Sequence, residues 1–281
     1  MTRLRLRFLK VGKVRFLGSR DTARLWERLL RLACVPVVMS EGFTPRARLH
    51  FGLALGVAQE SVSEYVDIDV ALEPHEVDLV SVVGRIDEAM PEGMSITDAV
   101  MIDRSELSLQ AVVTCCSWRF GAMGVTEDDL TRRVADALAA DSIVIERRRK
   151  GRDVEDDVRP TIEHLSVCDT STASEPILLA DLITKPRSLR PLELLRALGI
   201  EAPAAHVCRL EQWTGPVDAR LTPLEVASAR TSASVESDEL RVTSPPSGDQ
   251  SRRDHPHERP NAAGEPSGDH VRIELAELEI G

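Results

Sequence analysis

The sequence is poor in aromatic side chains and contains no long apolar run. Three Trp, one Tyr and five Phe are spread over 281 residues. No stretch approaches the roughly 18 apolar residues that a membrane span needs. The N-terminal MTRLRLRFLKVGKVRF alternates cations with apolar residues where a signal peptide would need an apolar core. We therefore expect a soluble, cytoplasmic protein that makes no membrane contact.

The chain also lacks the spacings of cysteine and histidine that metal and cluster sites use. Its five cysteines form no CxxC pair, and the CxxxCxxC signature of a radical S-adenosylmethionine enzyme is missing. Cys115 and Cys116 lie in the apolar run AVVTCCSW, so inert core thiols are expected rather than a redox pair. Because GxSxG, HExxH, P-loop and GxGxxG motifs are absent too, we expect no metal and no cofactor. The catalytic residues stay unknown, and a non-enzymatic protein is favoured over an enzyme.

The formal net charge of -11 hides a polarised chain. Residues 1–50 carry 12 basic and 3 acidic side chains, whereas residues 51–110 carry 2 basic and 13 acidic ones. The first block is typical of a surface that binds the phosphates of a nucleic acid. The same counts also fit a fold in which the basic block forms ion pairs with the acidic block. Both interpretations stay open at this stage.

Apolar periodicity predicts an α+β fold made of tandem ferredoxin-like β/α sandwich units. The first unit is expected over residues 1–104 and the second over residues 105–222. Residues 223–281 are rich in Ser, Pro, Gly and acids, which predicts a low-complexity acidic tail that is mostly disordered. The terminal HVRIELAELEIG fits either a short docking helix or the end of that tail.

Local patterns predict the elements of the first unit. The run RLRLRFL alternates cations with apolar residues, as in a strand with one buried and one solvent-exposed face. The face expected to be exposed to solvent carries Arg3, Arg5 and Arg7. A helix is expected over residues 19–34 and a buried strand at VPVVM. A second helix is expected to open at Pro74 and to turn Val80 inward.

A basic surface and one stiff loop are the candidate nucleic-acid contacts. In the turn GFTPR, Gly42 permits a positive φ and Pro45 holds the preceding residue extended. Phe43 at its tip either stacks on a base of single-stranded RNA or packs inward as a plug. Asp21 fits a helix cap better than an acid or base. The candidate nucleic-acid-binding residues are Arg5, Arg7, Arg15, Arg20, Arg24, Phe43, Arg46 and Arg48.

Several short motifs, in order and at compatible spacing over about residues 3–215, together resemble a known family. They include Arg-Phe in the first loop, the GFTP turn, the SEYVDIDV strand, the DVRP element and the closing HVCRLEQW. The motif residues are Phe16, Asp21, Gly42, Thr44, Pro45, Glu64, Tyr65, Asp157, Arg159 and Pro160. The chain is similar to the radical-SAM-linked family, a domain of unknown function that occurs alone or fused behind a cobalamin-binding radical S-adenosylmethionine protein.

The resemblance implies an RNA or translation context, with a separate radical SAM protein or ribonuclease E/G-type machinery as partner. The family usually has histidine in the first loop and after the GF-x-P turn, where this chain has Gly18-Ser19-Arg20-Asp21 and Arg46, so imidazole chemistry is not expected. The leading hypothesis is an RNA-binding or substrate-presenting accessory module. An RNA-modifying or RNA-processing enzyme, and a protein-interaction adaptor that uses EYVDIDV and the tail, stay open as alternatives.

Overall fold

The computed structural model describes residues 2–149, 151–168, 175–200, 206–230 and 270–272. The first half contains, in chain order, β1 (Thr2–Lys10), η1 (Gly12–Phe16), α1 (Ser19–Leu32), β2 (Leu49–Phe51), β3 (Glu60–Val70), η2 (Pro74–Glu76), α2 (Leu79–Glu88) and β4 (Met94–Ile102). The second half contains α3 (Leu109–Val112), β5 (Val113–Gly121), α4 (Glu127–Ala139), β6 (Val144–Arg149), β7 (Arg152–Asp157), η3 (Arg159–Thr161), β8 (Ile162–Cys168), β9 (Ile177–Ile183), α5 (Pro191–Ala197), β10 (Val207–Thr214) and η4 (Val217–Ala219). A helical segment at residues 223–230 and strand β11 (His270–Arg272) complete the described chain.

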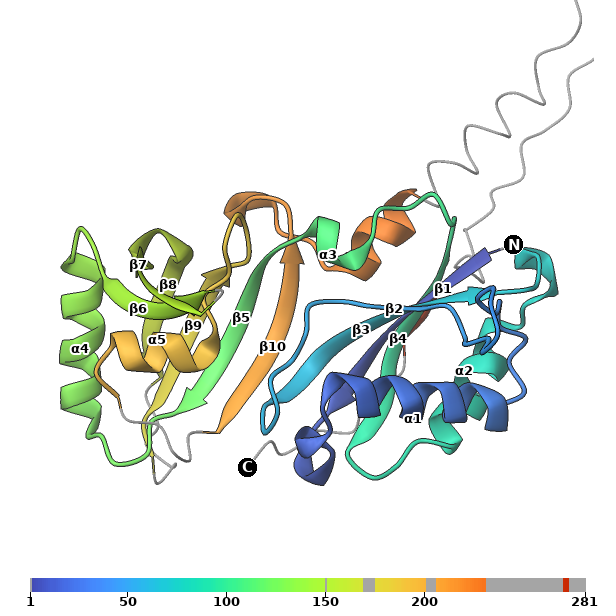
Figure 1. Ribbon diagram of the computed structural model, residues 1–281, viewed down its shortest axis with the longest axis horizontal. Coiled ribbons are helices and arrows are strands. Elements are labelled where there is room, and N and C mark those ends of the chain that lie inside the picture. Colours follow the sequence, from blue (N-terminus) through green and yellow to red (C-terminus); the bar gives the residue numbers. More distant parts are fainter. Residues whose placement is uncertain (1, 150, 169–174, 201–205, 231–269, 273–281) are drawn as a thin grey trace, which may run out of the picture.

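One nine-stranded sheet runs through both halves (Figure 1), in the order β11-β4-β1-β3-β10-β5-β9-β8 with β2 paired to β3. The hairpin β6-β7 stands apart from it. Within the sheet, β4-β1-β3-β2 of the first half and β10-β5-β9-β8 of the second have the same relative order. The halves join where β3 and β10 pair in parallel, with Cys208 opposite Glu60 and Arg209 opposite Ser61. The expected α+β class is confirmed.

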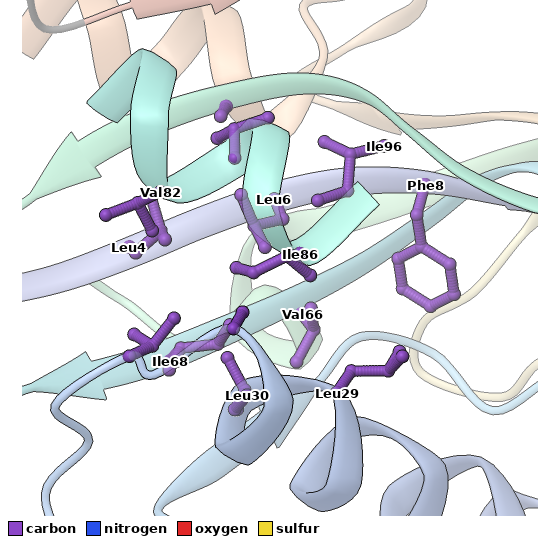
Figure 2. Close-up of a cluster of buried hydrophobic side chains, with 14 of the residues drawn as sticks. Leu4, Leu6, Phe8, Leu29, Leu30, Val66, Ile68, Val82, Ile86 and Ile96 are labelled. Carbon is purple, nitrogen blue, oxygen red and sulfur yellow. The ribbon is translucent and has the colours of Figure 1, made fainter. Parts of the chain in front are cut away.

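The core of the first half lies between the sheet and helices α1 and α2 (Figure 2). Leu4, Leu6 and Phe8 alternate along β1 and point to this side, as the RLRLRFL pattern predicts. Leu29 and Leu30 of α1 close the layer from the helix side, and all five side chains are almost completely buried. Burying such side chains contributes about 1.5–3 kcal/mol each, so this layer fixes the position of α1 on the sheet.

Two elements of the first half differ from the sequence-based expectation. The VPVVM run is not a strand, because Val37 and Met39 form only isolated bridges, to Val70 and Ala47 respectively. The second helix begins at Leu79, where the Asp78 side chain accepts a hydrogen bond from the Ser81 amide (3.1 Å). Leu79, Val82, Val83 and Ile86 form the buried face of this helix, so Val80, expected inward, is 65% exposed.

The C-terminal region also requires a correction. Residues 223–230, assigned from composition to the tail, form a helical segment on which Leu224 and Ala227 are buried. His270–Arg272, expected in a short helix or in the tail, form a strand that pairs with β4. The remainder of the expected disordered tail, 231–269 and 273–281, lies outside the described residues.

Candidate nucleic-acid interface

The arginines of β1 form ion pairs within the protein instead of lying on a solvent-exposed face of the sheet. Arg5 is only 2% exposed, and its Nε and Nη2 donate to the two carboxylate oxygens of Asp67 (2.8 and 2.9 Å). Arg3 Nε donates to Asp69 (2.8 Å). The prediction that Arg5 lies on an accessible basic surface is therefore wrong, and its bidentate pair is an internal contact between the basic and acidic blocks.

Arg5 is buried because the face of the sheet opposite α1 and α2 is covered. Tyr65, Val100 and Ile102 on that face pack against Leu109 and the helical segment 223–230. Arg5 also donates to two backbone carbonyls of this cover, Leu107 and Pro223 (both 3.3 Å). Sequence alternation along β1 shows which side chains share a face, but the cover comes from segments a hundred or more residues away.

Arg7, Glu64 and Tyr65 lie at the seam between the two halves. Arg7 Nη2 donates to Glu211 of β10 (2.7 Å), and the Tyr65 hydroxyl donates to the other oxygen of the same carboxylate (3.0 Å). Glu64 pairs with Arg209, which is 1% exposed. Burial raises the pKa of Glu211 and of Tyr65. The EYVDIDV strand is thus internal, which removes it as the contact surface of an adaptor.

Helix α1, by contrast, presents exposed arginines. Arg24 is 69% exposed and lies 3.5 Å from the Asp21 carboxylate, which is 58% exposed, so this pair is weak. Asp21 is not the helix cap, because Gly18 holds that position and no side chain caps the helix. The exposed Arg20, Arg28 and Arg31 form no ion pair with any residue that the structure describes.

The GFTP loop lies beside α1 and holds Phe43 out in solvent. The Ser40 amide donates to the Arg46 carbonyl (2.7 Å), and the Arg46 amide donates to Ser40 Oγ (3.0 Å), which closes the loop. Gly42 at its tip has φ +124°, a backbone conformation that favours glycine. Phe43 is fully exposed, and its neighbours Thr44 and Pro45 are exposed as well, which contradicts the interpretation of Phe43 as an inward plug.

The loop is positioned by contacts to its neighbours on both sides. The Arg46 guanidinium, 62% exposed, approaches Glu27 of α1 to 3.8 Å. Arg48 is half-buried, and its backbone bonds to Val38 and to Asp69. The structure therefore places Arg46 and Phe43 with the outer arginines of α1 and sets Arg48 at the base of the loop.

Arg15 and Phe16 of η1 extend this surface toward the second half. Arg15 pairs with Glu60 (2.9 Å) and its guanidinium lies 5.0 Å above the Phe16 ring. The Phe16 ring is 59% exposed. An exposed ring with a stacked cation is a surface on which a nucleobase can pack.

The DVRP residues of the second half have a structural role away from this surface. Asp157 accepts from the amides of Ile143 (2.9 Å) and Arg159 (3.0 Å), and these bonds lower its pKa. Arg159 donates to the carbonyls of Leu138 (3.1 Å) and Ala140 (3.2 Å) at the end of α4. Pro160, which is exposed, is the second residue of η3. This set closes the C-terminal end of a helix, as a cation there does.

Sequence analysis missed a cleft of about 1020 Å³ that lies between the halves. The stretch 53–59 forms one wall, and residues of β6, the loop after β9 and α5 form the other. Several arginines line the cleft, namely Arg147, Arg148, Arg187, Arg190, Arg196 and Arg209. The only sequence signals for it are the basic runs ERRRKGR and KPRSLR, which do not show that the two runs converge.

The buried thiols are protonated at neutral pH. Burial raises the pKa of Cys116 and of Cys208, each to about 11, and it also raises the pKa of Cys115. Within the described part of the chain, no group of three or more His, Cys, Asp or Glu residues could hold a metal ion. None of the described helices is long and apolar enough to cross a membrane.

Comparison with known proteins identifies a family and little beyond it. No curated protein matches the chain. A chain of the structure described as "Crystal Structure of a Cbf5-Nop10-Gar1 Complex" is similar at 11% identity and a TM-score of 0.42, over 74% of this chain and 48% of that chain. This chain thus spans about half the length of that one. Residues 3–191, more than half of the sequence, match the model of a family described as "Uncharacterized protein conserved in bacteria (DUF2344)". The chain belongs to this bacterial family of uncharacterised proteins.

Proposed function

We propose that the protein is an RNA-binding or substrate-presenting accessory module rather than an enzyme. The observation that carries the proposal is the exposed face of α1. Arg20 and Arg28 have no ion-pair partner among the described residues, and the fully exposed Phe43 lies on the adjoining loop. Exposed cations attract phosphates, and an exposed ring offers a stacking surface for an unpaired base.

Arginine and one aromatic ring suit a single strand better than a duplex. A guanidinium donates to two phosphate oxygens in a fixed planar geometry, and it also stacks on bases. Phe43 stands at the end of a short, closed loop, so its ring can contact a base that is already unstacked. We therefore propose single-stranded RNA as the ligand of this surface.

The partners follow from the family resemblance and belong to the same proposal. A module that holds RNA would present it to a separate radical SAM protein or to ribonuclease E/G-type machinery. The repeated order of strands in the two halves supports a tandem ferredoxin-like architecture for such a module. Fold alone does not assign function, so the partners require direct identification.

Ultraviolet crosslinking in cells tests the proposal. Tagged protein is irradiated, purified and analysed for bound RNA by sequencing and for bound protein by mass spectrometry. We expect crosslinked RNA and crosslinked peptides from residues 41–46, and a clear loss of crosslinks for Phe43→Ala. The matched control is Met123→Ala, since Met123 is also exposed but lies in the second half. Recovery of no RNA above an unirradiated control would overturn the RNA-binding proposal.

A further inference from the structure

The cleft between the halves has an aliphatic wall and a cationic wall. Leu53, Leu55 and Val57 line the first wall, and Val57 is 61% exposed. Arginines of β6 and α5 line the second. Helices α1 and α5 both lie in front of the sheet in Figure 1. Residues of α5 also line the cleft.

The cationic wall has more arginine than its acids can neutralise. Arg147 and Arg187 share Asp156, at 3.5 and 2.5 Å, and Arg147 also pairs with Glu193 (2.8 Å). At the base, Arg209 is neutralised by Glu64 and lies 5.3 Å from the centre of the Trp118 ring. The exposed members Arg148, Arg190 and Arg196 have no ion-pair partner among the residues the structure describes.

The cleft continues the basic surface of the first half. The Ala58 amide donates to the Arg15 carbonyl (3.0 Å), so the wall formed by residues 53–59 is attached directly to η1. The exposed Phe16 ring and the Arg15 guanidinium on it therefore belong to the element that adjoins this wall, although neither residue lines the cleft itself. Next along the chain comes the N-terminus of α1, with Arg20 and Arg24.

We infer that the cleft is an RNA-binding site in its own right: it holds phosphates of a single-stranded RNA that also lies on α1, with one base stacked on Phe16. This inference rests on the proposed function and deepens it. The arginines come from separate segments of β6 and α5, which suits the spaced phosphates of a polynucleotide backbone. The exposed Phe16 ring, on the element that adjoins the wall of residues 53–59, favours RNA over an acidic peptide, which needs no stacking surface.

Three matched double variants test the inference, each of which removes two arginines. The cleft variant is Arg148→Gln/Arg196→Gln, the helix variant is Arg20→Gln/Arg28→Gln, and the control is Arg132→Gln/Arg152→Gln, which lies outside both surfaces. Binding of a fluorescein-labelled 20-nucleotide oligouridylate is measured by anisotropy over a salt series. We expect the cleft variant to bind about ten-fold more weakly, with a salt slope shallower by about 1.4, because each lost phosphate contact on a single strand removes about 0.7.

A fourth variant tests the stacking step separately. Phe16→Leu keeps an exposed apolar side chain on η1 but removes the ring, so we expect binding weaker by about five-fold or more with the salt slope unchanged. An unchanged affinity would contradict the assignment of Phe16. The same variants are tested with fluorescein-labelled polyglutamate to identify an acidic peptide as the occupant.

The outcomes separate the inference from the proposed function. If the helix variant weakens RNA binding and the cleft variant binds as tightly as the control, the inference is overturned and the proposed function stands. Weaker RNA binding in the cleft variant alone supports the cleft site and overturns the assignment of RNA binding to α1. Polyglutamate binding that only the cleft variant loses, with RNA binding intact, shows an acidic peptide site and overturns the inference. If the wild-type protein binds no oligouridylate, both proposals are overturned.

Discussion

Arginines on β1 and arginines on α1 differ in what surrounds them, although the two elements are neighbours in the sequence. Arg5 on β1 is 2% exposed and bonded to a carboxylate and two backbone carbonyls. Arg24 on α1 is 69% exposed and has one weak contact. The comparison teaches that a cation-rich segment has two separate uses, one inside the fold and one on its surface. Which use applies is decided by the elements that pack over that face.

The largest effect should come from breaking the internal pair. Arg5→Ala leaves Asp67 buried without its cation, which costs about 3–5 kcal/mol of unfolding free energy. The measurement is urea denaturation followed by circular dichroism. Arg24→Ala is the matched control on the surface and should cost less than about 1 kcal/mol. Equal losses for the two variants would contradict the distinction between internal and surface arginines.

Strong acid should remove the stabilisation that the internal Arg3–Asp69 pair provides. Burial acts to raise the pKa of Asp69, but the hydrogen bond and charge of Arg3 and the charge of Arg104 outweigh it, so the pKa lies below its ordinary value of 3.8. The Asp69 carboxylate therefore binds a proton more readily in the unfolded chain than in the folded protein. The stabilisation is present above about pH 4 and is lost as the pH falls through the folded-state pKa.

Urea denaturation at several pH values between 5 and 2.5 measures this dependence. Asp69→Asn should be less stable than the wild type at pH 5, and its unfolding free energy should fall less steeply with acid. A wild-type and a variant protein with the same acid slope would show that the Arg3–Asp69 contact does not contribute.

The smallest effect on stability is expected at the loop tip. Because Phe43 is fully exposed, Phe43→Ala should change the unfolding free energy by no more than about 0.5 kcal/mol. Thermal denaturation of the two proteins measures this. A loss of more than about 2 kcal/mol would mean that the ring is buried in solution, as in the inward-plug interpretation.

Local patterns were sufficient to predict β1 and α1 of the first half. The alternation of RLRLRFL predicted β1 and its buried residues Leu4 and Leu6. Thr126 is the N-cap of α4, where its side chain accepts a hydrogen bond from the Asp129 amide (3.3 Å), three positions away. These features depend on residues within a few positions of each other, which a sequence displays directly.

Features that depend on distant segments could not be predicted in the same way. The sheet face that carries Arg5, which the sequence predicts to be exposed to solvent, is covered by residues near Leu109 and by the segment 223–230. The composition of the tail concealed that this segment has two apolar residues three positions apart, Leu224 and Ala227, which dock on the sheet. The cleft combines residues 53–59 with arginines from Arg147 to Arg209. Because these segments are far apart in the sequence, local periodicity does not predict that they meet.

The measurement that tests the account most directly compares RNA affinity and melting temperature in the same variants. Arg20→Gln/Arg28→Gln should bind a single-stranded oligouridylate about ten-fold more weakly, and the slope of log K against log salt should be shallower by about 1.4, with the melting temperature unchanged. The control Arg132→Gln/Arg152→Gln should match the wild type in both. A variant with a lower melting temperature and an unaltered salt slope would contradict the account, because the arginines of α1 would then serve the fold as those of β1 do.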